Sequence, residues 1–340
     1  MLKLAVVILN WNGADMLARY LPSVVRCSQT EGVEVVVADN GSSDTSLDLL
    51  HSDFPDVRVV RLDQNYGFAE GYNRALKEIE AEYYLLLNSD VEIRQTDWLV
   101  PMLEYMDGHS DVAACQPKVR WLVEPEKFEY SGASGGYLDC YGFPFCRGRI
   151  LSTLETDMGQ YDTVAEVHWA TGCSLMIRSA DYWAAGGLDN RFFAHMEEID
   201  LCWRLRIMGR RLVCIPQSTV YHLGAATLAA GSPRKTYLNF RNNLLMLYKN
   251  LPEADMKRVF GWRRPLDVLA ALHFLAAFDW KNFKAVFQAY RAFHRMKPDF
   301  AADRQRIQQG RVATAQPDRT DYCILWRYYL RGVRKYAELL

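Results

Sequence analysis

The first 90 residues alternate short apolar runs with segments of helical spacing, and this alternation limits the fold more than any other feature of the chain. The apolar runs have the length and the Val, Ile and Leu content of strands buried on both faces. Strands that alternate with helices of this length predict an α/β fold with a mostly parallel, doubly wound sheet. We predict strands over residues 4–9, 33–38, 57–62 and 83–87, and helices over 14–25, 45–50 and 68–79.

Polar residues follow the four predicted strands. They read NWNG at residues 10–13, DNGSSD at 39–44, NYG at 65–67 and NSD at 88–90. Turns rich in Asn, Asp and Gly often end a strand for conformational reasons alone. The carboxyl ends of parallel strands meet at one edge of the sheet, however, where open α/β folds bind their ligands. Four such turns together predict a ligand site at this edge.

Three carboxylates, Glu197, Glu198 and Asp200, stand where we predict that a helix begins, over residues 199–208. Carboxylates favour a helix N-terminus, but capping accounts for only one of the three. Neighbouring acids repel one another, and this repulsion raises the pKa of at least one of them. A carboxylate with a raised pKa suits proton abstraction near neutral pH. The cluster therefore predicts a general base or a cation site.

The rest of the sequence separates into an irregular middle and a helical end. Residues 120–165 are rich in Gly and Tyr and predict a loop or β-meander over the sheet. We predict further strands over residues 167–177, 212–215 and 219–222. From residue 235 the pattern is mostly helical, with predicted breaks near Pro252, Pro265, Pro298 and Pro317.

Charge divides the chain into two parts. Residues 234–340 contain 21 Lys and Arg against 9 Asp and Glu, a net charge of +12. Residues 1–233 contain 19 basic and 32 acidic residues, a net charge of −13. We therefore predict two parts with different roles, an acidic part over residues 1–233 and a basic, mostly helical extension over residues 234–340.

Several features indicate a cytoplasmic protein. No apolar run reaches the roughly 18–20 residues that span a bilayer, and no signal-peptide pattern is visible. The eight cysteines are scattered and mostly lie in apolar runs, which favours free thiols over a structural zinc site. The C-terminal part mixes aromatic and basic residues, which is typical of peripheral contact with an anionic inner leaflet. Packing of a helical subdomain explains the aromatic residues equally well.

At this point several stretches together resemble the family 2 glycosyltransferases, which are inverting enzymes with the GT-A fold. Within that family the chain is similar to the rhamnosyltransferase-like branch of bacterial envelope polysaccharide synthesis. The resemblance covers about residues 1–250, with the motifs in order and at sensible spacing. It implies that residues 1–233 form the GT-A nucleotide-sugar-binding and catalytic domain. The matching stretches are VVILNWNG (6–13), VVVADNGSSDTS (35–46), NYGFAEGYNRAL (65–76), YYLLLNSDVEI (83–93), WATGCSLMIRS (169–179), GGLDNRFFAHMEEIDLCWRLRIMGRRLVCIP (186–216) and VYHLG (220–224).

The resemblance implies transfer of a sugar from a nucleotide-diphosphate donor to a hydroxyl of a glycan or lipid-linked acceptor. Glu198 aligns with the family's general base. Asp39 resembles the residue that accepts from the nucleobase imide, although capping its own turn is the alternative role. Asn73 is also expected at the donor, unless it is a satisfied polar residue within its helix. The full set of expected donor contacts is Asn10, Asn12, Asp39, Asn65, Gly67, Asn73, Asn88 and Ser89.

The resemblance also implies a divalent metal, Mn²⁺ or Mg²⁺. Asn88-Ser89-Asp90 occupies the place of the family's DxD motif, but its first position is an uncharged Asn. Asp90 is then the expected direct ligand, and His222 resembles a histidine that supplies a second metal contact. Oxygen ligands suit either cation, whereas a histidine ligand favours Mn²⁺.

The remaining expected site residues lie near the sugars and the diphosphate. Glu197, Gly172 and Asp200 are expected near the donor or acceptor sugar, with Gly172 leaving room beneath the base. Asp200 is also a candidate to cap its helix or hold a basic side chain. Lys235 and Arg241 are expected to close over the diphosphate, and a solvated helix face is the alternative.

Other functions fit the sequence less well. A nucleotidyltransferase would carry a Gly-rich, Arg-containing loop after the first strand, where this chain has Asn-Trp-Asn-Gly. A GxGxxG motif after that strand, a P-loop and a nucleophile elbow are all absent, as are the recognisable nucleic-acid-binding modules. A non-catalytic scaffold with the same fold is the main alternative, because the DxD motif is altered. The donor nucleotide and sugar, the acceptor, the linkage and the oligomeric state remain open.

Overall fold

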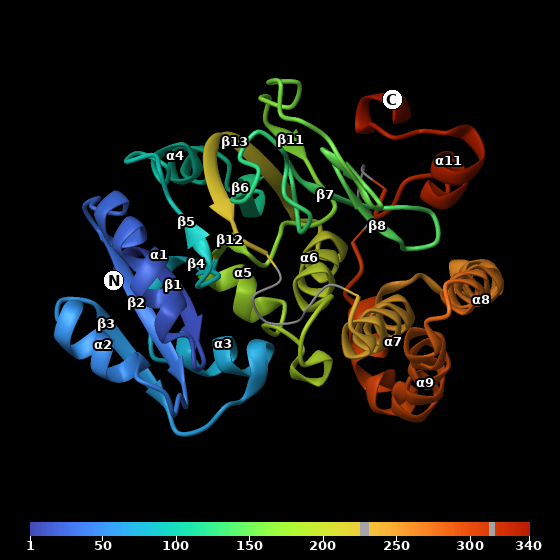
Figure 1. Ribbon diagram of the computed structural model, residues 1–340, viewed down its shortest axis with the longest axis horizontal. Helices are drawn as coiled ribbons and strands as arrows, with labels where there is room; N and C mark the ends of the chain where they lie inside the picture. Colours follow the sequence, from blue (N-terminus) through green and yellow to red (C-terminus); the bar gives the residue numbers. More distant parts are fainter. Residues whose placement is uncertain (225–230, 313–316) are drawn as a thin grey trace.

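The computed structural model describes residues 1–224, 231–312 and 317–340. Its centre is a mixed sheet in which the four predicted strands of the first 90 residues lie parallel, in the order β3-β2-β1-β4 (Figure 1). Apolar runs buried on both faces explain this arrangement. These strands are β1 (Leu2–Asn10), β2 (Val33–Asn40), β3 (Arg58–Leu62) and β4 (Ala81–Leu87).

Later strands extend the same sheet beyond β4. β12 (Ser174–Arg178) is antiparallel to both β4 and β6 (Val112–Trp121), and β13 (Arg211–His222) runs parallel to β6. Two short strands, β5 (Val91–Glu92) and β11 (Ala165–Glu166), pair antiparallel with β13. The carboxyl ends of β4 and β13 therefore come together, although more than 130 residues separate them.

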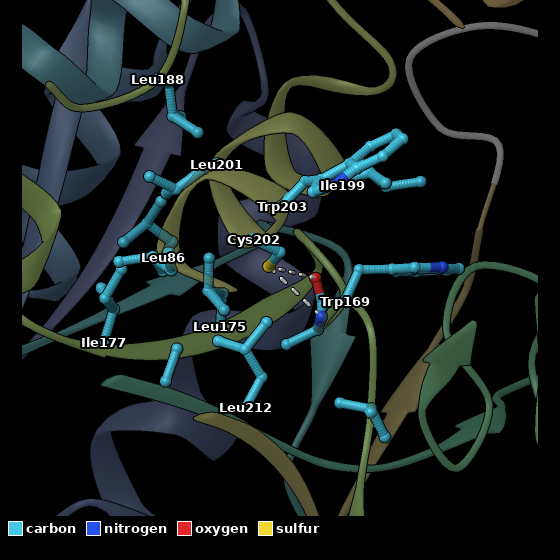
Figure 2. Packing of buried hydrophobic residues seen from close by; sticks show 14 of the residues in the cluster. Leu86, Trp169, Leu175, Ile177, Leu188, Ile199, Leu201, Cys202, Trp203 and Leu212 are labelled. Atoms are coloured by element: carbon cyan, nitrogen blue, oxygen red, sulfur yellow. Dashed lines mark hydrogen bonds between the residues drawn. The ribbon is translucent and has the colours of Figure 1, made fainter. Parts of the chain in front are cut away.

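Helices cover both faces of the sheet. One core cluster contains Leu4, Val6 and Ile8 of β1 together with apolar residues of α1 (Ala14–Cys27), α2 (Ser46–Asp53) and α4 (Val100–Gly108). The alternate residues of β1 belong to a second cluster with α3 (Gly67–Lys77), α5 (Ser179–Ala184) and α6 (Glu197–Ile207). Figure 2 shows part of this second cluster, where α6 packs over β4 and β12. Successive side chains of a strand point to opposite faces of the sheet. The domain therefore has three layers, with the sheet between two layers of helices.

The middle of the chain forms a small antiparallel sheet, as its Gly- and Tyr-rich pattern indicated. Its strands follow the order β10-β9-β8-β7. They are β7 (Gly136–Leu138), β8 (Pro144–Cys146), β9 (Arg149–Ile150) and β10 (Thr153–Leu154).

The C-terminal part is helical and packs on the sheet domain through α7 (Figure 1). Residues from both sides of position 233 share one core cluster, including Trp203 and Leu247. The division into domains at this position stays a prediction. The helices are α7 (Pro233–Asn250), α8 (Glu253–Ala276), α9 (Trp280–Met296), α10 (Ala301–Gln309) and α11 (Ile324–Arg331), with short 3₁₀ turns at Asn190–Phe192, Lys297–Phe300 and Tyr336–Leu339. No helix within the described ranges is long and apolar enough to cross a bilayer.

Three predicted elements are wrong in detail. Residues 167–173 are not a strand but an irregular, mostly buried segment between β11 and β12. The two predicted strands at 212–222 form the single strand β13, with a register shift between Ile215 and Thr219. Pro265 does not break the chain but lies inside α8, whose buried residues, including Arg263 and Leu266, hold the helix against the protein. Packing thus overrides the local preference of proline.

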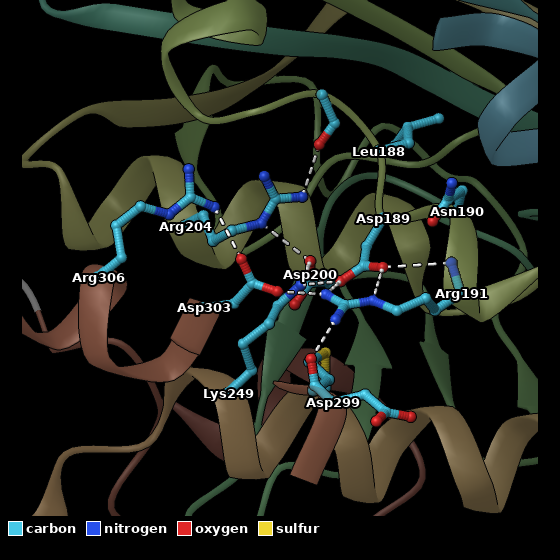
Figure 3. A network of polar contacts seen from close by, with 12 residues as sticks. Leu188, Asp189, Asn190, Arg191, Asp200, Arg204, Lys249, Asp299, Asp303 and Arg306 are labelled. Carbon is cyan, nitrogen blue, oxygen red and sulfur yellow. Dashed lines mark hydrogen bonds and ion pairs between the residues drawn. The ribbon is translucent and has the colours of Figure 1, made fainter. Parts of the chain in front are cut away.

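A buried ionic network joins α7 to α6 and to the segment before it (Figure 3). The ammonium group of Lys249 is 2.7 Å from carboxylate oxygens of both Asp189 and Asp200. Arg191 pairs with Asp189 at 2.7 Å, and Arg204 pairs with Asp200 at 2.9 Å. The side chain of Lys249 is only 2% exposed. Buried charges are tolerated only when they are paired in this way.

We predict that Lys249→Met lowers the free energy of unfolding by about 3–5 kcal/mol, because it leaves two buried carboxylates without their shared cation. Urea denaturation measures the change. Lys257→Met is the matched control, because Lys257 is exposed on α8. An equal, small effect of both variants would contradict a stabilising role for the network.

Candidate active site

A pocket lies at the carboxyl ends of β4 and β13, beneath the start of α6. It brings together eight of the residues expected at the site: Asn88, Ser89, Asp90, Gly172, Glu197, Glu198, His222 and Lys235. Leu9, Phe68, Ser131, Thr171, Cys173, Ala194 and His195 complete its lining. The pocket therefore draws on eight separate parts of the sequence.

One wall of the pocket holds the expected metal ligands. Nε2 of His222 lies 3.1 Å from Oδ1 of Asp90 and 3.3 Å from Nδ2 of Asn88. The pairing of His222 with Val91, between β13 and β5, sets this geometry. Burial alone would raise the pKa of Asp90, but the hydrogen bond and charge of His222 hold it below its usual value.

This wall fits a divalent cation with an incomplete set of protein ligands. A carboxylate oxygen and an imidazole nitrogen converge there, and both residues are 4% exposed. In the part of the chain that is described, no three His, Cys, Asp or Glu residues are arranged as a complete metal site. A cation at Asp90 and His222 would need further oxygens from a bound diphosphate and water, as Mg²⁺ and Mn²⁺ commonly use.

The first turn of α6 forms another part of the pocket lining. Glu197 is 5% exposed and Glu198 is half-buried, and one carboxylate oxygen of each has no hydrogen-bond partner among the residues that the structure describes. Burial raises the pKa of Glu198, and burial together with the charge of Glu198 raises that of Glu197 well above its usual value. Burial is thus the main cause, rather than the crowding of acids expected from the sequence.

Gly172 faces Glu198 across the pocket. A Cβ atom at this position would lie 3.5 Å from the side chain of Glu198, at ordinary contact distance. The hydrogen side chain of glycine therefore leaves space next to the carboxylate, as expected.

The backbone that leads into α6 is held in an unfavourable conformation. Phe193, His195 and Met196 have φ angles of 68°, 70° and 74°, which residues other than glycine rarely adopt. Such conformations persist only where surrounding contacts enforce them, and they often occur at functional sites.

Asn242 of α7 supplies these contacts. Its side-chain Nδ2 lies 3.0, 2.9 and 2.8 Å from the backbone oxygens of Phe192, Ala194 and His195, to which it donates. Asn242 is fully buried. One amide group therefore holds the segment that precedes Glu197 and Glu198.

His195 and Lys235 lie on the α7 side of the same pocket. Burial, with a smaller contribution from the charge of Lys235, lowers the pKa of His195 to about 4. The imidazole is therefore neutral near pH 7, and Lys235 remains available to an anionic ligand.

The turns after β1 and β2 form a second polar region at the same edge of the sheet. Oδ1 of Asp39 accepts from Nδ2 of Asn10 at 3.3 Å, and Oδ2 accepts from the backbone N–H of Ser42 at 3.0 Å. Oδ1 of Asn12 accepts from the backbone N–H of Ser43 at 2.8 Å. Asp39 is fully buried and accepts hydrogen bonds within its own turn, as the alternative role predicted. Contact with a nucleobase therefore requires this region to open.

The turn before α3 is held by Asn40. Its side chain bonds to Oδ1 of Asn65 at 3.1 Å, the carbonyl of Gly67 at 3.0 Å and the N–H of Tyr66 at 3.0 Å. Gly67 has a φ of 76°, and a Cβ atom there would lie 3.2 Å from the ring of Phe193. Asn65 and Gly67 thus lie at the edge expected for the donor, outside the pocket.

Three expected site residues point elsewhere. Asn73 bonds through its side chain to the backbone of Leu188 and to the hydroxyl of Tyr182, within the protein. Asp200 belongs to the buried ionic network and so holds basic side chains rather than a sugar. Arg241 donates to the carbonyl of Phe192 at 2.9 Å and does not line the pocket. None of the three side chains lines the pocket, and each stabilises the surrounding structure through contacts within the protein.

Comparison with solved structures identifies the fold. The mannosyltransferase PcManGT from Pyrobaculum calidifontis, in complex with GDP-Man and Mn²⁺, aligns with a TM-score of 0.53 and 14% identity over 91% of this chain and 85% of that one. S. aureus TarS 1-349 in complex with UDP-GlcNAc aligns with a TM-score of 0.53 and 16% identity over 91% and 89%. The chain has the GT-A fold of nucleotide-sugar-dependent transferases, which confirms the predicted fold class.

The family follows from the sequence. The profile described as "Glycosyl transferase family 2" matches residues 5–181, more than half of the chain. This protein belongs to glycosyl transferase family 2.

Its relatives include rhamnosyltransferases. It is 26% identical to the N-acetylglucosaminyl-diphospho-decaprenol L-rhamnosyltransferase of Mycobacterium tuberculosis over 238 residues, 64% of this chain and 75% of the relative. It is also 26% identical to the rhamnosyltransferase WbbL of Escherichia coli over 168 residues, 46% and 61% of the two chains. The resemblance to the rhamnosyltransferase-like branch is therefore confirmed.

We predict that Asn242→Ala frees the segment before α6. Loss of these buried hydrogen bonds lowers the free energy of local opening by about 1–3 kcal/mol. Amide hydrogen exchange over residues 193–197 should become about 5- to 150-fold faster, since 1.4 kcal/mol corresponds to a factor of ten.

Asn243→Ala is the matched control, because Asn243 is the next residue of α7 and donates to the carbonyl of Gly142 at 2.9 Å, with only a 4.0 Å contact to Sδ of Met196. Equal exchange rates over residues 193–197 in the two variants would contradict the role of Asn242.

Proposed function

We propose that this glycosyltransferase moves a sugar, with inversion, from a UDP- or dTDP-sugar to a hydroxyl of a glycan or lipid-linked acceptor. The observation that carries the proposal is the pocket itself, in which Glu198 is brought together with Asp90 and His222. A general base and a site for the leaving diphosphate are the two groups that an inverting transfer needs, because no covalent sugar intermediate forms.

In the proposed reaction, Glu198 takes the proton of the acceptor hydroxyl. The acceptor oxygen forms a bond to the anomeric carbon as the bond from that carbon to the diphosphate oxygen breaks on the opposite face. A raised pKa makes Glu198 a suitable base near neutral pH. The space beside Gly172 receives the sugar next to this carboxylate.

The leaving diphosphate requires positive charge. A divalent cation at Asp90 and His222 would supply Lewis-acid stabilisation of the diphosphate, and cations accompany the nucleotides of relatives with this fold. Lys235 adds an ammonium group from α7. The nucleoside would extend from there toward Asn10, Asn12, Asp39 and Asn65, with Asp39 released from its turn contacts.

The acceptor is proposed from the relatives. One acts, by its name, on N-acetylglucosaminyl-diphospho-decaprenol, and another is an O-antigen biosynthesis protein of Myxococcus xanthus. We propose that this chain likewise acts in bacterial cell-envelope polysaccharide synthesis.

A lipid-linked acceptor requires contact with a membrane, and the C-terminal helices offer a surface for it. Leu269 and Leu272 on α8 are 61% and 48% exposed, and Phe278 and Trp280 beyond it are 85% and 56% exposed. The same two helices carry exposed basic residues: Arg264 on α8, and Lys281, Lys284 and Arg291 on α9. Apolar and aromatic side chains flanked by cations suit the interface of an anionic leaflet.

We predict that calorimetry detects metal-dependent binding of one nucleotide among UDP, dTDP and GDP, tested with Mn²⁺, Mg²⁺ and a chelator. Glu198→Gln should keep that affinity within a few fold and abolish sugar transfer, because the amide cannot take a proton. Asp90→Ala should remove the metal dependence.

The matched control is Glu166→Gln, which changes a carboxylate on β11 outside the pocket and should leave transfer intact. Absence of nucleotide binding under all conditions would favour the scaffold alternative. Loss of both binding and transfer in Glu198→Gln would show that Glu198 has a structural role.

We predict that the protein cosediments with vesicles that contain anionic lipid and binds neutral vesicles weakly. Lys281→Ser combined with Lys284→Ser should weaken binding by about 2 kcal/mol, since each cation near an anionic surface contributes about 1 kcal/mol. Arg19→Ser combined with Arg26→Ser, on exposed positions of α1, is the control. Equal binding of both double variants would contradict the proposed surface.

A further inference from the structure

A third carboxylate lies behind the proposed metal site. Glu129 stands between β6 and β7 and is 2% exposed. Its Oε1 lies 3.4 Å from Nδ1 of His222, the imidazole nitrogen that faces away from Asp90. His222 is therefore placed between two carboxylates, Asp90 at Nε2 and Glu129 at Nδ1. Neither the motifs nor the spacing of the sequence singled out Glu129.

The surroundings of Glu129 fix its orientation. Its other oxygen, Oε2, accepts from the backbone N–H of Ser131, which leaves Oε1 toward the imidazole. Gly224 keeps this space open, because a Cβ atom there would lie 3.0 Å from Oε1, and its φ of +73° also disfavours any side chain. In the described structure Nδ1 of His222 makes no hydrogen bond of full geometry, and Oε1 of Glu129, at ion-pair distance, is the carboxylate oxygen that faces it.

A histidine can bind a metal through Nε2 only when its proton is on Nδ1. The group that accepts from Nδ1 selects this tautomer and fixes the plane of the ring, and a carboxylate in that place also makes Nε2 a better donor. Glu129 meets these requirements by position, burial and charge, and it does not line the pocket itself.

We propose that Glu129 is a positioning residue that holds His222 with its proton on Nδ1, so that a divalent cation replaces the proton that Nε2 otherwise shares with Asp90. The inference rests on the proposed function, since it assigns a role toward the same cation. It adds a carboxylate–histidine–metal relay in which Glu129 acts only through His222.

The test measures Mn²⁺ affinity by electron paramagnetic resonance, with UDP or dTDP present. Loss of a carboxylate of this kind weakens metal binding by about 10- to 100-fold. Glu129→Gln keeps an acceptor for Nδ1 but loses the charge, so the smaller loss is expected. Glu129→Leu removes both, so the larger loss is expected. Glu155→Gln is the control, a buried carboxylate that accepts instead from Tyr161 and Tyr336.

A second measurement follows the tautomer directly. Nitrogen-15 spectra of the His222 ring in the Mg²⁺-loaded protein should show the proton on Nδ1 in the wild type and in Glu129→Gln. Unchanged Mn²⁺ affinity in Glu129→Gln, with its fold intact by circular dichroism, would overturn the inference, as would a proton on Nε2 in the wild type. If instead the wild type itself binds no Mn²⁺, the proposed metal site fails, and the role of Glu129 fails with it.

Discussion

The ion pairs of Lys249 with Asp189 and Asp200 are the interaction on which the rest of the structure depends. The ammonium group of Lys249 is removed from water and lies between Asp189 and Asp200, so it stabilises the fold only because both carboxylates are in place. Asp189 precedes α6, Asp200 belongs to its first turns, and Lys249 lies on α7. The contact therefore fixes the direction of α6 relative to α7, and with it the position of the carboxylates that precede Asp200. Asn242 lies on the same face of α7 about two turns earlier and continues the same junction.

The first half of the fold could be predicted from the sequence because its signals are local. Apolar runs of strand length define β1, β2 and β4 whatever surrounds them. The errors fall where tertiary contacts decide: the segment 167–173 is apolar because it is buried, not because it is a strand, and Pro265 stays helical because its neighbours pack. Local sequence patterns predict burial well. They predict backbone geometry only where a buried segment is also a regular strand or helix.

The site shows the same limit. Asp90, His222 and Glu198 were found through residue types in a recognisable order. Glu197, Glu198 and Asp200 looked equivalent in the sequence, yet successive helical positions turn by about 100°, so the first two line the pocket and the third faces Lys249. Asn242 and Glu129 left no signal, because they act on a backbone and on another side chain. Only the three-dimensional arrangement reveals residues that act through others.

The strained segment before α6 has a consequence for how the protein matures. The sheet and the edge that we propose for the nucleotide are complete by β13, but the amide that holds Phe192, Ala194 and His195 in place arrives only with Asn242. A chain that is still being synthesised, or one cleaved within α7, thus has Glu197 and Glu198 without the hydrogen bonds that hold the segment before them. The placement of Glu197 and Glu198 is in this sense a property of a chain that has reached α7, and a shorter copy keeps the sheet without an ordered start to α6.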